Sequence, residues 1–405
     1  MDRIDVAIIG AGPYGLSLAA HLRARNVPYR QFGLPMSLWR TAMPQGMYLK
    51  SEGLASNLSD PGDLHTLEAF CQSTGHSYAR SGLPVPLATF VAYGQWFQSE
   101  LGLAVDESLV TNVVRRDDGF ELTGSNGDVV VARRVVVAIG VEHFARVPKV
   151  LSELPRELCT HSSAHSDLAS FRDQEVVIVG VGQSGLELAG LMHEIGARVT
   201  VLARRSVAWN SEPHRAGRPL VEQLKSPQSG LGHGWRYWAY ANLPDVYHRL
   251  PRDIKLAKAW STLGPSGAPW LRSRVEGQVP ILTGHAVEWA KPVGGLARLG
   301  GTQPGGTSFE LAADHVIAAT GYRPELNRLT FLSEAIRAQL RTAGGSPALG
   351  LDFQSSVPGL YFIGAAAAAS FGPVSRFVYG SKHAATSLAR RLAAGSGTAS
   401  GLRPR

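Results

Sequence analysis

Apolar and polar positions follow the same order at two places along the chain. Near the start, a short apolar run at residues 5–9 predicts a strand, a helical period covers residues 15–25, and residues 29–32 form a second apolar run. The second copy has a strand, a helix and a strand at residues 176–179, 184–195 and 199–202. Two strands joined by a helix in about thirty residues form a βαβ unit, so the pattern predicts two such units in a doubly wound α/β protein.

The rest of the pattern suggests how the two units are arranged. Further apolar strands are expected at residues 129–131, 135–139, 314–319 and 360–364, and a helix at 379–392. Residues 209–289 are rich in Trp and Pro, and residues 294–306 have the glycines of a hairpin or flexible loop. We therefore expect one domain from residues 1–145 and 310–395, a second domain inserted at 146–309, and a flexible tail at 396–405.

Composition narrows the class of protein. The chain has 405 residues, of which 44% are hydrophobic and 18% charged, so a sizeable core is available. Cys71 and Cys159 are its two cysteines; they allow neither a disulfide framework nor a Cys-x-x-Cys pair and favour a reducing, cytoplasmic setting. We expect no membrane anchor, because glycines and a proline interrupt the apolar run at residues 6–20. The net charge of +8 comes from scattered arginines, which favours polyanionic cofactors over nucleic acid.

The first unit contains a glycine-rich turn between its strand and its helix. Gly10, Gly12 and Gly15 allow a tight turn and let a pyrophosphate approach backbone N–H groups at the positive end of the helix. The alternative is a glycine-rich turn with no ligand. The second strand ends in Gln31, Phe32 and Gly33 and lacks the usual carboxylate for the ribose hydroxyls, so a main-chain group or Gln31 is expected to make that contact.

The second unit repeats the turn with Gly180, Gly182 and Gly185 and differs where its last strand ends. Arg204 and Arg205 stand where an NAD site would place an acid, and two guanidinium groups can bind a 2′-phosphate with bidentate hydrogen bonds. NADPH is therefore favoured over NADH. The alternative is a solvated strand end.

With two dinucleotide units, one inserted into the other, the chain resembles the flavin-dependent monooxygenases that include flavin-containing monooxygenases and lysine and ornithine N-hydroxylases. Residues 318–322 (Ala-Ala-Thr-Gly-Tyr) are similar to the Ala-Thr-Gly-Tyr element of this class, on the strand expected to return to the first domain, and residues 182–184 are similar to the N-hydroxylase form of its NADPH fingerprint. The resemblance implies an FAD domain with an NADPH domain inserted into it.

Further similarities extend over most of the chain. Trp39 resembles the tryptophan that follows the flavin ribose loop, and residues 47–50 (Met-Tyr-Leu-Lys) resemble the N-hydroxylase segment under the isoalloxazine ring. Residues 360–364 and 371–373 resemble the closing strand and helix start at the ribityl and pyrimidine end of the flavin. Together these patterns assign FAD to Gly10, Gly12, Pro13, Gly15, Gly33, Trp39, Met47, Thr320, Gly321, Gly364, Phe371, Gly372 and Pro373, and NADPH to Gly180, Gly182, Gln183, Ser184, Gly185, Arg204 and Arg205.

Two candidate catalytic residues come from the resemblance. Asn57 aligns with an asparagine kept near the reactive C4a edge of the flavin, and Lys50 with a lysine that binds a substrate carboxylate. Asn57 can also be a plain turn residue, and Lys50 an ordinary surface or flavin-side lysine. Residues 158–166 lack the Phe-x-Gly of the flavin-containing and Baeyer-Villiger fingerprint, which favours the N-hydroxylases, but Met47-Tyr48 replaces their Met-Gln pair and leaves an amino-acid substrate in question.

Other chemistry is less well supported by the sequence. His161 and His165 lack the helix and the glutamate of a zinc site, so no metal is expected. The tryptophans between residues 235 and 289 either wall a substrate pocket or pack a core.

The resemblance implies an enzyme in which NADPH reduces FAD and dioxygen then forms a C4a-hydroperoxyflavin. Its partners are dioxygen and a small nucleophilic metabolite, which we expect to be an amine or amino-acid-like molecule undergoing N-hydroxylation; a homo-oligomer is compatible with it. One alternative is an NADPH oxidoreductase that passes electrons to a quinone or a protein, although the cysteine count excludes a route through a local dithiol. The other is a non-enzymatic redox sensor.

Overall fold

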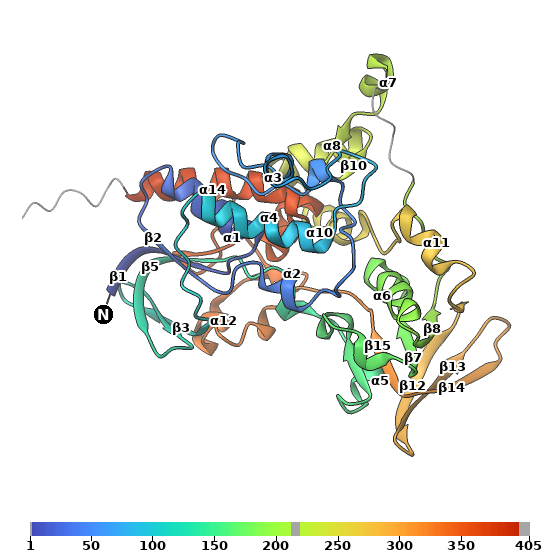
Figure 1. The fold of residues 1–405 in the computed structure, drawn as a ribbon. Coiled ribbons are helices and arrows are strands. Elements are labelled where there is room, and N and C mark those ends of the chain that lie inside the picture. The colour runs from blue at the N-terminus through green and yellow to red at the C-terminus, as the bar shows by residue number, and fades with distance from the viewer. Residues whose placement is uncertain (1, 212–218, 397–405) are drawn as a thin grey trace, which may run out of the picture.

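The chain folds around two β-sheets with a broad cavity between them. The computed structural model describes residues 2–211 and 219–396 (Figure 1). In these residues, one sheet has the strand order β2-β1-β5-β4-β3 with β18 also paired to β5, and the other has the order β11-β8-β7-β15-β6. The predicted fold class, two Rossmann-like domains, is confirmed.

The first sheet forms the core of the first domain. Its parallel strands carry continuous apolar runs because helices cover both faces, and Ile8 lies opposite Val136 in the register of β1 and β5. The predicted strands at 129–131 and 135–139 are one long strand, whose first half pairs with β4 and whose second half pairs with β18. The strands are β1 (Asp2–Ile9), β2 (Tyr29–Phe32), β3 (Val110–Arg116), β4 (Gly119–Gly124), β5 (Val129–Val137) and β18 (Leu360–Phe362).

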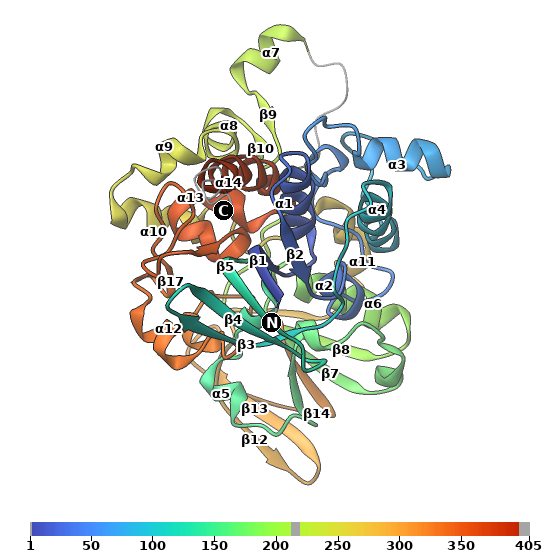
Figure 2. The same cartoon turned by 90° about the vertical axis from the view of Figure 1, so that its left-hand side faces the viewer.

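Two long helices cover this sheet together. Helix α1 begins with Pro13 directly after its N-cap, Gly12, which suits a helix start because a proline there loses no internal hydrogen bond. Leu16, Leu18 and Leu22 are fully buried, since α14 packs against α1 (Figure 2). The helices of this domain are α1 (Pro13–Arg23), α2 (Ser37–Thr41), α3 (Leu67–Thr74), α4 (Leu87–Glu100), α12 (Glu334–Gln339), α13 (Ala368–Phe371) and α14 (Ser381–Ser396), and β16 (Thr342–Ala343) pairs with β17 (Ser346–Pro347).

The second sheet is parallel throughout and forms the centre of the inserted domain. Helix α6 packs on one face, while Ala290, Ala297 and Leu299 of an antiparallel layer share a core with Val177 and Val316 on the other. The predicted hairpin near residues 294–306 belongs to this layer. The elements are α5 (Lys149–Ser152), β6 (Cys159–His161), β7 (Glu175–Val179), α6 (Gln183–Glu194), β8 (Arg198–Ala203), α11 (Arg272–Val275), β11 (Ile281–Thr283), β12 (Ala286–Val293), β13 (Leu296–Thr302), β14 (Ser308–Ala313) and β15 (His315–Ala318).

The domain boundary expected at residue 310 is corrected by the strand pairing. β15 pairs with β6 and β7, so it belongs to the second sheet and does not return to the first domain. The chain returns just after it, where Tyr322 bridges Ala145 and the N–H of Arg146 donates to the carbonyl oxygen of Gly321. The two crossings between the domains therefore lie side by side.

Part of the Trp- and Pro-rich region also belongs with the first domain. Its helices α9 and α10 pack against α13, and α8 packs against residues 373–376, near α14 (Figure 2). A sequence period cannot show which neighbour a helix will cover, which is why the whole region was expected in the second domain. The elements are α7 (Leu220–Lys225), β9 (Gln228–Ser229), β10 (Gly232–His233), α8 (Trp235–Asn242), α9 (Pro244–His248) and α10 (Arg252–Ser261).

The end of the chain differs from the expectation by a few residues. Helix α14 continues to Ser396, four residues beyond the predicted helix, so residue 396 does not belong to a tail. The remaining predicted tail, residues 397–405, lies outside the described residues. Among the helices that the structure describes, we find none with the length and apolar character needed to cross a bilayer.

Candidate active site

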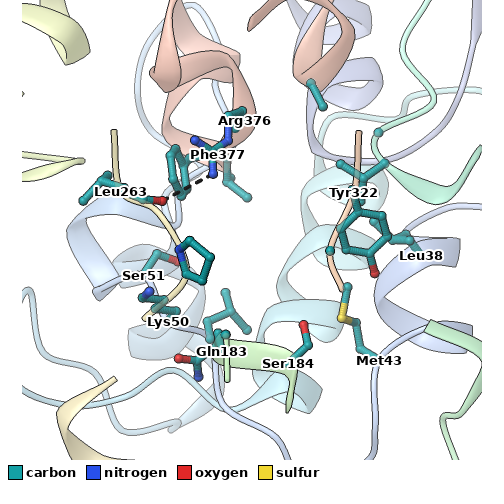
Figure 3. A pocket seen from close by; sticks show the side chains of 18 of the residues that line it. Leu38, Met43, Lys50, Ser51, Gln183, Ser184, Leu263, Tyr322, Arg376 and Phe377 are labelled. Atoms are coloured by element: carbon teal, nitrogen blue, oxygen red, sulfur yellow. Dashed lines mark hydrogen bonds between the residues drawn. The ribbon is translucent and has the colours of Figure 1, made fainter. Parts of the chain in front are cut away.

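A cavity of about 2490 Å³ lies between the domains, at the carboxyl ends of the parallel strands of both sheets. Both glycine-rich turns line it, as do both crossings between the domains. In the close view, Lys50, Leu263 and Arg376 lie on one side, Leu38, Met43 and Tyr322 on the other, and Gln183 and Ser184 below (Figure 3). Ligands of open α/β sheets bind at this end of the strands, so one cavity can receive two nucleotides.

The first turn is shaped to admit a ligand. Gly10 has φ +118°, and a Cβ there would lie 2.5 Å from the carbonyl oxygen of Ala138. A Cβ on Gly15 would lie 2.0 Å from the carbonyl oxygen of Gly10, so this glycine is needed for packing the helix on the strand and does not line the cavity. Gly12 faces open space, since a Cβ added there would have no atom within 4 Å. The turn therefore leaves room for a phosphate at the start of α1.

Gln31 does not reach the cavity. Its side chain is fully buried and its Nε2 donates to the carbonyl oxygen of Gly10 at 3.0 Å. The interpretation of Gln31 as a ribose contact is therefore wrong, and Gly33 and Leu34 line the cavity at the end of β2 instead. Gln31 supports the turn from behind.

The second turn has the geometry of the first. Gly180 has φ +123°, and a Cβ there would lie 2.4 Å from the carbonyl oxygen of Ala319. A Cβ on Gly185 would lie 2.1 Å from the carbonyl oxygen of Gly180, the same close approach as at Gly15. Gly182 and Ser184 line the cavity. A Cβ on Gly182 would meet only Pro265, at 3.6 Å, so the turn leaves the start of α6 facing the cavity.

Arg204 and Arg205 follow β8 and line the cavity with exposed side chains. No ion pair joins either guanidinium group to an acidic residue among those that the structure describes. Both groups are therefore available to a phosphate beside the second turn.

The segment from Met47 to Lys50 lines the cavity and is tied to the second domain. The Nζ of Lys50 donates to the carbonyl oxygen and the Oγ of Ser266, at 2.8 and 2.6 Å. Burial and the nearby charge of Arg376 lower the pKa of Lys50 to about 8. The predicted FAD residue Trp39 also lines the cavity, with its ring edge on Phe90.

Gln183 connects the second turn to this segment. Its Nε2 donates to Oε2 of Glu187 at 3.0 Å, and its Oε1 accepts from the N–H of Ala268 at 2.9 Å. Oε1 of Glu187 accepts from the N–H of Tyr48 at 3.3 Å. Since Ser266 holds Lys50, these bonds link the 47–50 segment, α6 and the 266–268 loop.

Asn57 does not reach the cavity. Its Oδ1 accepts from the N–H of Leu67 at 2.8 Å, which satisfies a free donor at the first residue of α3. The catalytic interpretation of Asn57 is therefore not supported, and the structure gives it the role of a helix cap.

Near the end of the chain, the residues that line the cavity lie a few positions after those predicted to bind FAD. Phe371 stacks on Phe353 with ring centroids 4.0 Å apart, and Gly372 packs on the ring of Tyr247. Together with Gly364 and Pro373 they lie behind the cavity wall, and residues 375–378 line the cavity in their place. Thr320 and Gly321 line it as predicted.

Three cavity or wall residues were not singled out from the sequence: Tyr14, Glu187 and Arg376. The hydroxyl of Tyr14 donates within the 374–377 segment, to the carbonyl oxygens of Ser375 and Phe377 at 3.0 and 2.8 Å. Tyr14 and Glu187 lie in stretches already recognised, whereas Arg376 lies between residues 371–373 and the helix predicted at 379–392. Each of the three has a hydrogen-bond partner that is distant in the sequence. No spacing rule would have selected them.

Known dinucleotide-binding oxidoreductases are similar to this chain in sequence and in fold. The model of a pyridine nucleotide-disulphide oxidoreductase family matches residues 87–226. An indole-3-pyruvate monooxygenase of Oryza sativa subsp. japonica is 26% identical over 337 residues, covering 78% of this chain and 76% of that protein. The ornithine N-hydroxylase of Kutzneria sp. 744 aligns with a TM-score of 0.76 and 19% identity, over 97% of this chain and 100% of that one.

A reductase shares the same fold. Bacillithiol disulfide reductase from Bacillus cereus aligns over 97% of this chain and 100% of that one, with a TM-score of 0.66 and 19% identity. The chain therefore has the two-domain fold of these solved proteins, with a cavity between its two sheets. Over most of its length the chain is similar to flavin-dependent monooxygenases, as the sequence motifs indicated.

Proposed function

We propose that the chain is an FAD- and NADPH-dependent monooxygenase that oxygenates a small nucleophilic metabolite, most simply by N-hydroxylation of an amine or amino-acid-like substrate. One observation carries the proposal: two glycine turns of matching geometry open into one cavity, and an arginine pair free of acidic partners among the described residues follows the second turn.

The residues present fit both cofactors. The open space at Gly12 suits the FAD pyrophosphate at the start of α1, and Gly182 with Ser184 suits that of NADPH at the start of α6. Arg204 and Arg205 would bind the 2′-phosphate. FAD, when bound, supplies the hydride acceptor and the reaction with dioxygen.

The chain itself would orient the reactants and keep water away. Leu38, Trp39 and Met43 give the cavity an apolar wall, which excludes water from a reacting flavin edge. Lys50 has an ammonium group with a pKa near 8 and a third N–H beyond the two used on Ser266, so it can hold an anionic group of a substrate.

A thiol-dependent reductase is a weaker candidate. Cys71 and Cys159 are buried and free, and neither lines the cavity in the part of the chain that the structure describes. A disulfide reaction would need a thiol beside the flavin. This observation weighs against a disulfide as the partner of the reduced enzyme.

Stopped-flow absorbance tests the proposal. The FAD-loaded enzyme is reduced anaerobically with NADPH and mixed with oxygenated buffer. We expect a long-lived absorbing species between reduced and oxidised flavin, which decays faster when primary amines are present. Asn57→Ala is the control: as a helix cap it should lower stability by about 1 kcal/mol and leave the lifetime unchanged. Direct return of oxidised flavin in one step, with NADP⁺ present, contradicts oxygen transfer.

A further inference from the structure

Arg376 is a cation built into the cavity wall. It lines the cavity beside Lys50 (Figure 3), and burial lowers its pKa. One nitrogen, Nη1, donates to the carbonyl oxygens of Ala259 and Thr262 at 3.0 and 2.9 Å, and Nη2 donates to that of Leu263 at 3.4 Å. These carbonyls close the carboxyl end of α10, so the guanidinium group is fixed in place.

The backbone that carries Arg376 is also fixed. The hydroxyl of Tyr14, next to the first glycine turn, donates to the carbonyl oxygens of Ser375 and Phe377 on either side of it. The guanidinium carbon lies 5.4 Å from the ring centroids of both Trp260 and Phe377. Aromatic faces stabilise a cation without neutralising it.

No acidic side chain in the described part of the chain neutralises this group. Among the described residues, Arg376 forms no ion pair with a carboxylate, and Lys50 forms none either. The cavity-lining carboxylate of Glu52 accepts from the Oγ of Ser81 and the Nε2 of Gln228. Withdrawing a cation from water without a counter-charge is costly, and an arginine has five N–H donors, of which carbonyls take three here. Two uncompensated cations therefore face one part of the cavity.

We propose that Arg376 and Lys50 together bind an anionic group, a carboxylate or a phosphate-like group, of a substrate whose apolar or aromatic body lies against Trp260, Phe377 and Tyr237. All five residues line the cavity. The proposal rests on the proposed function, because it assigns this end of the cavity to the substrate of that reaction. It narrows the substrate from any small nucleophile to an anionic one with an apolar body.

Equilibrium binding tests the proposal without turnover. The oxidised, FAD-loaded enzyme is titrated with 3-phenylpropanoate, with its uncharged amide and with benzylphosphonate, and the flavin spectrum reports binding. We expect the carboxylate to bind at least about tenfold more tightly than the amide. Arg376→Gln should weaken the carboxylate by about thirtyfold and leave the amide nearly unchanged.

Further variants distinguish the loss of a cavity charge from a general loss of folding or of FAD. Arg323→Gln removes an exposed arginine elsewhere on the cavity and should leave all three dissociation constants unchanged. If Arg376→Gln does not retain FAD, Lys50→Met and Arg376→Lys take its place; Lys50→Met should still weaken the carboxylate selectively, and Arg376→Lys should retain part of the preference.

The outcomes of these binding titrations can be told apart from those of the stopped-flow test of oxygen transfer. Tighter binding of the phosphonate than of the carboxylate would support the anion site and assign it to a phosphate-bearing substrate. Equal binding of carboxylate and amide to the wild-type enzyme would overturn the proposal. So would an Arg376→Gln variant that changes the flavin midpoint potential while the carboxylate binds as before, since Arg376 would then act on the flavin. Neither result depends on whether the reduced enzyme transfers oxygen.

Discussion

The two glycine turns are close copies up to the end of the following strand, and there they diverge. Gly10 and Gly180 have φ values of +118° and +123°, and a Cβ on the helix glycines Gly15 and Gly185 would approach the preceding carbonyl oxygen to 2.0 and 2.1 Å. Near the end of β2, the side chain of Gln31 turns back to support its own turn, whereas two arginines after β8 line the cavity. Turn geometry decides that a dinucleotide fits, and the strand end decides which one.

Substituting the first glycine of each turn should separate the two cofactors. Gly10→Ala should lose FAD, while Gly180→Ala should retain FAD and lose reduction by NADPH, because a Cβ would strike a backbone carbonyl in either turn. We expect a cost of at least about 3 kcal/mol in each case. Flavin content and anaerobic reduction rates measure it.

Gly127 provides a control for backbone strain alone. Its φ is +85° and no atom lies within 4 Å of its Cβ position, so Gly127→Ala should retain both cofactors. If Gly180→Ala is still reduced by NADPH at the wild-type rate, the second turn does not bind the dinucleotide.

The arginine pair should account for nucleotide preference. In Arg204→Gln/Arg205→Gln, kcat/KM for NADPH should fall at least about a hundredfold while that for NADH stays the same, because each charge-assisted contact with a phosphate contributes about 1.5–3 kcal/mol. Steady-state kinetics with both nucleotides tests this. Arg198→Gln, which breaks an exposed pair with Glu175 at the far end of β8, is the matched control. An equal fall for NADH would assign the arginines a structural role.

One of the buried positions that differ between α1 and α6 has a carboxyl group in α6. Ser17 of α1 corresponds to Glu187 of α6, and burial raises the pKa of Glu187 to about 8 from a usual value of 4.5. The folded state then holds a proton that the unfolded state releases, so stability should fall as pH rises from about 4.5 to 8.

Substitutions of Glu187 and Ser17 should show that only Glu187 contributes to this pH dependence of stability. Glu187→Gln should reduce the loss of stability over that pH window by about 1–3 kcal/mol, and Ser17→Ala should leave the pH dependence as in the wild type. Denaturant unfolding at several pH values measures both. An unchanged slope in Glu187→Gln would show that its carboxyl group titrates normally.

The smallest effect is expected for Gln31, which supports the first turn from behind. Gln31→Met keeps the side-chain volume but removes the hydrogen bond to Gly10, so the free energy of unfolding should fall by about 1–2 kcal/mol without a change in nucleotide preference. Thermal unfolding and FAD titration check this. A large loss of FAD affinity at wild-type stability would instead support a contact between Gln31 and the FAD ribose.

Local pattern was sufficient for much of this fold. The strand at residues 29–32 is found at its predicted bounds, and the helices after both turns lie within two residues of theirs, since apolar period and glycine spacing are local signals. The pairing of β15 with the second sheet was missed because a buried strand carries no mark of its neighbours.

The candidate site shows the same difference between features set by local pattern and features set by distant partners. The turn glycines and Arg204 and Arg205 could be singled out because their places depend on position within a βαβ unit, and their binding of nucleotides stays a prediction. Asn57 was misread because a side-chain cap and a cavity amide look alike in sequence. Arg376 was missed because its partners are residues 259–263, more than a hundred positions away.

Anaerobic reduction of the FAD-loaded enzyme decides whether both turns serve one cavity. If they do, NADPH should bleach the oxidised flavin in a fast, saturable phase, NADH should do so far more slowly, and the double arginine variant should reduce the difference. Failure of NADPH to reduce the flavin, with FAD fully bound, would contradict a shared cavity.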